Sequence, residues 1–180
     1  ALVLSDNLTT TDGDDAGSIA LTATAGAITN GSTITLDSDD NVVLSAGTNI
    51  SLAVATTVQA DDDVTINGGT AGGAAGSDTL TLGILTSGQD TVAGNVLIGT
   101  TDSDPSVTLG GVVTATGGYV DVRGHDVAIN ANVTADAANS GVGLKVQAGN
   151  DVTLASTLTT SDGGSALDVD IDAGNDFTLT

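Results

Sequence analysis

The chain has 180 residues, with two basic residues against 23 acidic ones and a formal net charge of −21. This charge argues against a nucleic-acid-binding protein, which needs a basic surface, and against binding to anionic membranes. Cysteine is absent, which excludes disulfides and thiol chemistry, and no apolar run approaches the ~20 residues needed for membrane insertion.

The composition favours an all-β protein with a narrow core. Hydrophobic residues make up 39% of the chain and are almost all Val, Ile, Leu and Ala, with Tyr119 and Phe177 as the aromatic residues. A globular core of this size usually contains several aromatic rings, whereas stacked aliphatic rows need none. Every acidic residue is Asp, which suits turns better than helices. The charge is therefore expected in corners and loops.

Short strands of the apolar–polar–apolar type recur along the chain in two alternating series. The first series begins at Leu2, Ile28, Ile50, Leu80, Val107, Val127, Val152 and Phe177. The second begins at Ile19, Val42, Val64, Val96, Val120, Leu144 and Val169. In the first series, seven steps cover the 175 residues from Leu2 to Phe177, a mean of 25. A period in this range is typical of stacked repeats that bury their apolar faces only against one another.

A third inward position follows the first series by about six residues, which alternation places on the same side as the strand start. It is occupied by Leu8, Ile34, Val58, Leu85, Val113, Val133 and Leu158. Three short strands per repeat predict a roughly triangular cross-section. Because crossovers between parallel strands are almost always right-handed, we expect a right-handed parallel β-helix (β-solenoid) of about seven coils of ~25 residues. It forms a single domain over residues 1–180.

The repeat is most regular in the last part of the chain. The strand Leu144–Val146 returns as Val169–Ile171, and the corner Ala148–Asp151 returns as Ala173–Asp176, both at an offset of 25 residues. Elsewhere, insertions rich in Gly, Asp, Thr and Ser interrupt the coils. They lie at Thr9–Ser18, Asn67–Thr79 and Thr86–Asn95. This is turn and loop chemistry, so the insertions should protrude without disturbing the stack.

Neither end of the sequence shows a polar capping repeat. The chain opens on the strand Leu2–Leu4 and closes on the strand Phe177–Leu179. Soluble solenoids usually cap their terminal coils to protect the core and the open strand edges. We therefore expect the chain either to continue into flanking repeats of a longer protein or to stack end to end with copies of itself.

The corner before the first strand type carries an acidic residue in three successive coils, at Asp126, Asp151 and Asp176. In a solenoid these carboxylates stack ~4.8 Å apart and repel one another unless they are screened or bridged. Ca²⁺ prefers such oxygen ligands, so one hypothesis is a column of calcium ions at these three residues. The simpler interpretation is that each Asp hydrogen-bonds to its own turn.

The basic residues fall within the second series of strands. Stacking places Lys145 between Asp121 and Asp170, which indicates charge pairing across strands that helps to set the register. Polysaccharide-cleaving β-helices combine Lys, Arg and carboxylates, but this chain has almost none of the aromatic and basic residues that such sites use. We therefore expect no catalytic residue, no enzymatic activity and no cofactor other than calcium.

The phrase AGND–VTL followed by LTT and DGG, clearest over Val120–Thr180, resembles the repeats of filamentous-haemagglutinin-like bacterial surface adhesins. The resemblance implies a right-handed parallel β-helix, an extracellular or cell-surface location and contacts with other cell-surface components. The functional hypothesis is thus an extracellular structural fibre or adhesin stalk. The alternative is a calcium- or salt-dependent binding module with ions at the Asp-rich corners.

Overall fold

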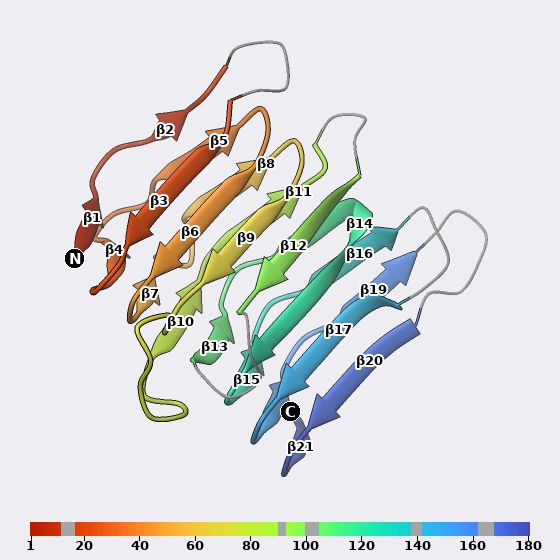
Figure 1. Cartoon of the computed structure of the whole chain (residues 1–180). Coiled ribbons are helices and arrows are strands. Elements are labelled where there is room, and N and C mark those ends of the chain that lie inside the picture. Colours follow the sequence, from red (N-terminus) through yellow and green to blue (C-terminus); the bar gives the residue numbers. More distant parts are fainter. Residues whose placement is uncertain (12–16, 90–92, 100–104, 138–141, 162–167) are drawn as a thin grey trace.

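The computed structural model describes residues 1–11, 17–89, 93–99, 105–137, 142–161 and 168–180, and every regular element in these ranges is a β-strand. The strands stack in parallel and form a right-handed β-solenoid of about six turns, close to the seven coils predicted (Figure 1). The first and last strands, and with them the two termini, lie at opposite ends of the stack.

The first face of the solenoid is an eight-stranded parallel sheet in which each strand pairs with the equivalent strand of the next coil. Its members are β1 (Leu2–Leu4), β4 (Ile28–Asn30), β7 (Ile50–Ser51), β10 (Thr79–Leu82), β13 (Ser106–Leu109), β15 (Val127–Ile129), β18 (Val152–Leu154) and β21 (Phe177–Leu179). All eight predicted strand starts of the first series pair in register, from Leu2 with Ile28 to Val152 with Phe177.

The second face follows the first in each coil. It contains β2 (Leu8–Thr9), β5 (Thr35–Ser38), β8 (Thr57–Ala60), β11 (Ile84–Ser87), β16 (Val133–Ala137) and β19 (Leu158–Ser161). The third face closes the coil. It contains β3 (Ile19–Ala23), β6 (Val42–Ala46), β9 (Val64–Asn67), β12 (Gly94–Ile98), β17 (Val142–Ala148) and β20 (Asp168–Ala173).

The long strand β14 (Val113–Gly124) belongs to both of these faces. Its first half pairs with β11 and β16, and its second half pairs with β12 and β17. The second and third faces are thereby joined through one continuous strand, with Gly117 in the left-handed region (φ 70°) near the change of face. The three strand positions per coil agree with the predicted cross-section.

Ile34 points inward as predicted, but another residue occupies the register position of the third inward column. Leu36, not Ile34, pairs with Leu8 on one side and with Val58 on the other. Ile34 is also buried and lies just before β5. Both residues point inward because they are two apart in an extended segment, so alternation alone does not decide which of them is in register.

The core is a tube of aliphatic side chains running along the solenoid axis. Residues such as Ile50, Leu80 and Val122 are completely buried. The buried polar side chains are Ser38, Thr56 and Ser87, and each is hydrogen-bonded at a corner. Burial falls away in the last coil, where Phe177 is 48% exposed and Leu179 is 68% exposed although both point inward.

The insertion between β9 and β10 lies against another corner of the solenoid. This segment reaches forward along the stack, and a Cβ at Gly76 would lie 2.5 Å from the His125 ring. This insertion therefore covers part of the corner that holds His125, where a freely protruding loop was expected. Parts of the insertions Thr9–Ser18 and Thr86–Asn95 lie outside the described residues.

Candidate functional site

The corner before the first face holds the three predicted carboxylates in one column. Val127, Val152 and Phe177 are in register, which aligns the preceding residues Asp126, Asp151 and Asp176 in successive coils. The structure thus stacks the residues proposed as calcium ligands in one column, one in each coil.

These carboxylates are tied to the following coil by hydrogen bonds. The Asn150 side-chain amide donates to Asp126 Oδ1 at 2.8 Å, and the Asp151 backbone N–H approaches the same oxygen at 3.4 Å. One coil further on, the Asn175 amide and the Asp176 N–H donate to Asp151 Oδ1 at 3.0 and 3.1 Å. Asp126 and Asp151 therefore each accept hydrogen bonds from the corner of the following coil, where the simpler interpretation had each Asp bonded to its own turn.

The electrostatics of Asp126 follow from these bonds. Partial burial raises the pKa of its carboxyl, but hydrogen bonds from the Asn150 amide, the Asp151 N–H and the Ser106 hydroxyl lower it by more, and the nearby His125 adds to this. The net result is a pKa below the usual value for Asp. The lowered pKa favours the ionised carboxylate, which can accept the hydrogen bonds from Asn150 and Ser106.

Within the described ranges, no three or more His, Asp or Glu side chains gather in a way that could hold a metal ion. At Asp126, Oδ1 accepts from Asn150 and Oδ2 accepts from the Ser106 hydroxyl at 3.2 Å. Any ion at this column would compete with these donors. Calcium binding at Asp126, Asp151 and Asp176 stays a prediction.

At other corners too, a side-chain oxygen accepts a backbone N–H of the following coil, which was not predicted from the sequence. Asn41 Oδ1 accepts from the Asp63 N–H at 3.1 Å, Asp63 Oδ1 accepts from the Asn95 N–H at 2.7 Å, and Asn95 Oδ1 accepts from the Tyr119 N–H at 3.1 Å. The signal is present in the sequence, because Asn41, Asp63 and Asn95 each stand directly before the first inward residue of a strand. We call these three residues, together with Asp126 and Asp151, the corner acceptors.

The outward surface of the third face carries a different constellation. Along β14, Tyr119, Asp121 and Arg123 alternate with the fully buried Val120 and Val122, so all three point to the same outer surface. The Arg123 guanidinium forms an ion pair with Asp121, with Nη2 2.7 Å from Oδ2 and Nε 3.0 Å from Oδ1. This two-point contact holds both groups in a fixed plane.

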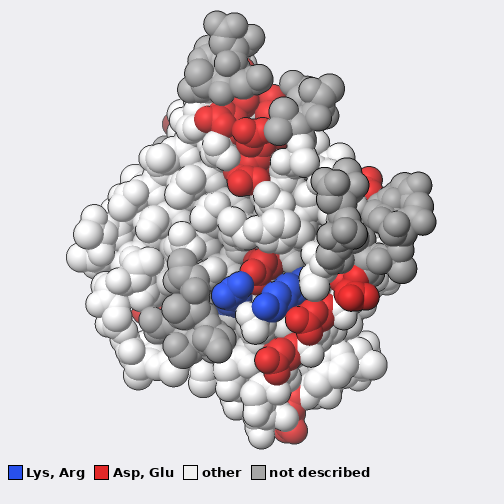
Figure 2. Space-filling model, turned by 45° about the vertical axis from the view of Figure 1, so that its right-hand side comes forward, with Lys and Arg blue, Asp and Glu red and all other residues white. Residues whose placement is uncertain are grey.

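A shallow concavity of about 310 Å³ lies on this surface. Its lining comes from β14 through Tyr119, Asp121 and Arg123 and from the two preceding coils through Thr65, Asn67, Leu97 and Gly99. Lys145 lies beside it, in register with Asp121 on one side and Asp170 on the other, as predicted. Figure 2 shows the two basic side chains close together on one face, with carboxylates beside them.

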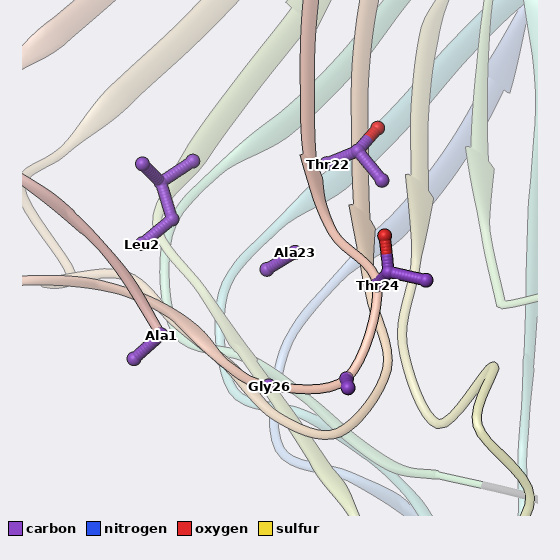
Figure 3. A pocket seen from close by; sticks show the side chains of 7 residues that line it. Ala1, Leu2, Thr22, Ala23, Thr24 and Gly26 are labelled. Carbon is purple, nitrogen blue, oxygen red and sulfur yellow. The ribbon is translucent and has the colours of Figure 1, made fainter.

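A second concavity, of about 360 Å³, lies at the amino-terminal end of the stack (Figure 3). It is lined by Ala1, Leu2 and residues 22–26, and no acidic, basic or imidazole side chain lines it. Its polar side chains are the hydroxyls of Thr22 and Thr24, with no charged group beside them, so the surface around β14 is the stronger candidate site.

The fold defines a β-solenoid, and the comparisons add no family to it. No protein-family model, curated protein or solved structure matches this chain. A search of the described residues finds no helix long and apolar enough to cross a membrane.

Proposed function

We propose that the protein is a non-enzymatic structural fibre or adhesin stalk of the extracellular space or cell surface, built from stacked coils. The observation that carries this proposal is the unbroken parallel ladder of the first face, which runs through eight strands from β1 to β21. The resemblance of Val120–Thr180 to adhesin repeats supports the same function and the same location.

Rigidity along the axis comes from three kinds of contact that repeat in each coil. Backbone hydrogen bonds join the strands, aliphatic side chains fill the tube, and corner acceptors such as Asp126 and Asn95 link one coil to the next. Together these contacts make a short rod that resists bending and stretching. Such a rod suits a stalk that holds a surface at a distance from its anchor.

The last described coil offers a surface on which a further coil can stack. Phe177 and Leu179 point inward and are largely exposed, and covering each would contribute about 2 kcal/mol. The strand edge of β21 also presents backbone groups for parallel pairing. We assign this surface to a further coil, supplied by flanking repeats or by a second copy of the chain.

Negative-stain electron microscopy of the 180-residue protein tests the self-stacking form of the proposal. We expect thin fibres whose length grows with protein concentration. The double variant Phe177→Asp/Leu179→Asp should yield only short single rods, because charge then lies on the stacking surface. The matched control Thr178→Asp changes the outward residue of the same strand and should still form fibres. Monodisperse single rods in every sample would overturn the self-stacking proposal.

A second candidate is a calcium- or salt-dependent module, and the acidic corners favour it. Asp40 and Asp62 lie in adjacent coils, since the Asp62 N–H donates to the Asp40 carbonyl at 3.1 Å, and the chain carries a net charge of −21. Thermal unfolding with calcium, with chelator and with NaCl at matched ionic strength tests it. A calcium-specific rise in Tm supports calcium binding, an equal rise with calcium and NaCl at matched ionic strength supports the salt-dependent form, and a Tm that does not respond to any of these conditions contradicts both.

A further inference from the structure

The surface around Tyr119 combines groups that are rare elsewhere in the chain. Tyr119 is the single tyrosine, tryptophan is absent, and Arg123 is one of two basic residues. Both line the same concavity, and Tyr119 is 40% exposed there. A volume of about 310 Å³ falls at the lower end of the range for small-molecule sites.

The hollow exists because one outward position lacks a side chain. Ile98 pairs with Ile66 on one side and with Val122 on the other, so the residues that follow, Asn67, Gly99 and Arg123, form one row across three coils. Gly99 adopts a φ of 74°, and a Cβ there would lie 2.0 Å from the Arg123 carbonyl oxygen. The backbone therefore requires glycine, and a gap is left between the amide of Asn67 and the guanidinium of Arg123.

The walls of this gap offer one apolar plane and several fixed polar groups. The Tyr119 ring and the Leu97 side chain are apolar, while Asp121 accepts and Arg123 donates hydrogen bonds. Thr65 and Asn67 add a hydroxyl and an amide from the neighbouring strand β9. A pyranose ring matches this set, because it has an apolar C–H face and a rim of hydroxyls that both donate and accept.

Charge selects among saccharides. The Asp121–Arg123 ion pair leaves the concavity without a net charge, and the chain as a whole carries −21. An anionic sugar would meet long-range repulsion and would find the guanidinium already paired. We infer that this concavity binds a neutral pyranose unit of an oligo- or polysaccharide, without cleaving it.

The single tyrosine makes the site directly observable. Because the chain has no tryptophan, its tyrosine fluorescence comes from Tyr119 alone. Cellohexaose, maltohexaose and mannohexaose, all neutral, are titrated into the 180-residue protein, with hexagalacturonate as the anionic comparison. At least one neutral hexasaccharide should change the Tyr119 emission saturably, and hexagalacturonate should not. The measurement is valid whether or not the protein forms fibres, so it is independent of the proposed function.

Variants then locate the binding by isothermal titration calorimetry. Tyr119→Ala and Arg123→Gln should each weaken binding about tenfold or more, as expected for a central anchor. Gln147→Ala is the matched control, because Gln147 pairs with Arg123 in the next coil but does not line the concavity. Its affinity should stay within about twofold of the unaltered protein. Arg123→Gln tests the site on its own should Tyr119→Ala fail to fold.

Three results would overturn the inference. One is the absence of saturable binding by any of the neutral hexasaccharides. Another is binding of hexagalacturonate alone, which would contradict the charge argument. The third is equal weakening by Gln147→Ala and Tyr119→Ala, which would place the ligand elsewhere on the surface.

Discussion

The side-chain amide of Asn150 donates a hydrogen bond of 2.8 Å to Oδ1 of Asp126, which lies 24 residues earlier in the chain and one coil away. The contact joins the corners of two successive coils, which are also linked by the Asn150 N–H donating to the His125 carbonyl at 2.8 Å. The amide of Asn150 thus lies beside the Asp126 carboxylate as a hydrogen-bond donor, so the column contains donors as well as like charges. Corner acceptors of this kind recur along the solenoid.

Removal of the Asp126 carboxylate should destabilise the stack. In Asp126→Ala, the Asn150 amide and the Ser106 hydroxyl lose their acceptor in a partly buried corner, at a cost of about 1–3 kcal/mol in the free energy of unfolding. Urea unfolding measures the change. The control Asp172→Ala removes an exposed outward carboxylate and should change stability by less than about 0.5 kcal/mol. Equal losses in both variants would show that net charge, not the corner bond, governs stability.

The same carboxylate should make stability depend on pH. The pKa of Asp126 is lower in the folded state than in the unfolded chain, so its contribution is present above the unfolded pKa and is lost as pH falls through the folded pKa. The difference in unfolding free energy between the unaltered protein and Asp126→Asn should therefore shrink below about pH 4. Urea titrations from neutral to acidic pH measure this difference. A difference that stays constant over the whole range would refute the assignment.

Gly88 should not tolerate a side chain. It adopts a φ of 68°, and a Cβ there would lie 2.2 Å from the Thr116 carbonyl oxygen of the next coil. Gly88→Ala should cost about 1–3 kcal/mol or more, which thermal unfolding can measure. The control is Gly31→Ala, where no atom lies within 4 Å of the added Cβ and φ is not positive. This control should be neutral or slightly stabilising because it restricts the unfolded chain.

The cost of a cavity should depend on the position along the stack. Leu85 and Leu158 occupy the same inward column, but Leu85 is fully buried, whereas Leu158 is only partly buried near the last coil. Leu85→Ala should cost about 2–5 kcal/mol and Leu158→Ala clearly less. Amide hydrogen exchange provides a second measurement, since the coil of Leu158 should open more readily than that of Leu85. Equal costs would contradict the argument from burial, because they would mean that Leu158 is as well covered in solution as Leu85.

Much of the fold could be predicted because β-strands alternate strictly. Every strand start from Leu2 to Phe177 and from Ile19 to Val169 is confirmed in register, since burial requires one apolar residue at each of these positions. Ile34 is buried as predicted, but the sequence did not show that Leu36, also inward, is the residue in register with Leu8 and Val58. Side-chain partners were harder to predict, because the partner of a residue such as Asn95 lies in another coil at a variable distance along the chain.

The candidate site, too, could be predicted only in part from the sequence. Lys145 was correctly placed between Asp121 and Asp170, because register follows from the repeat. The concavity itself could not be foreseen, since it depends on the backbone conformation of Gly99 and on three coils at once. Alternation along β14 could nevertheless have shown that Tyr119, Asp121 and Arg123 share one surface.

The corner acceptors also give the stack a direction. Asn41, Asp63, Asn95 and Asp126 each use a side-chain oxygen to receive an N–H from the following coil. Each coil thus presents side-chain acceptors to backbone N–H groups of the coil that follows it. A chain that folds from its amino-terminal end can therefore add its coils one at a time, each new coil docking onto the corner acceptors of the coil before it.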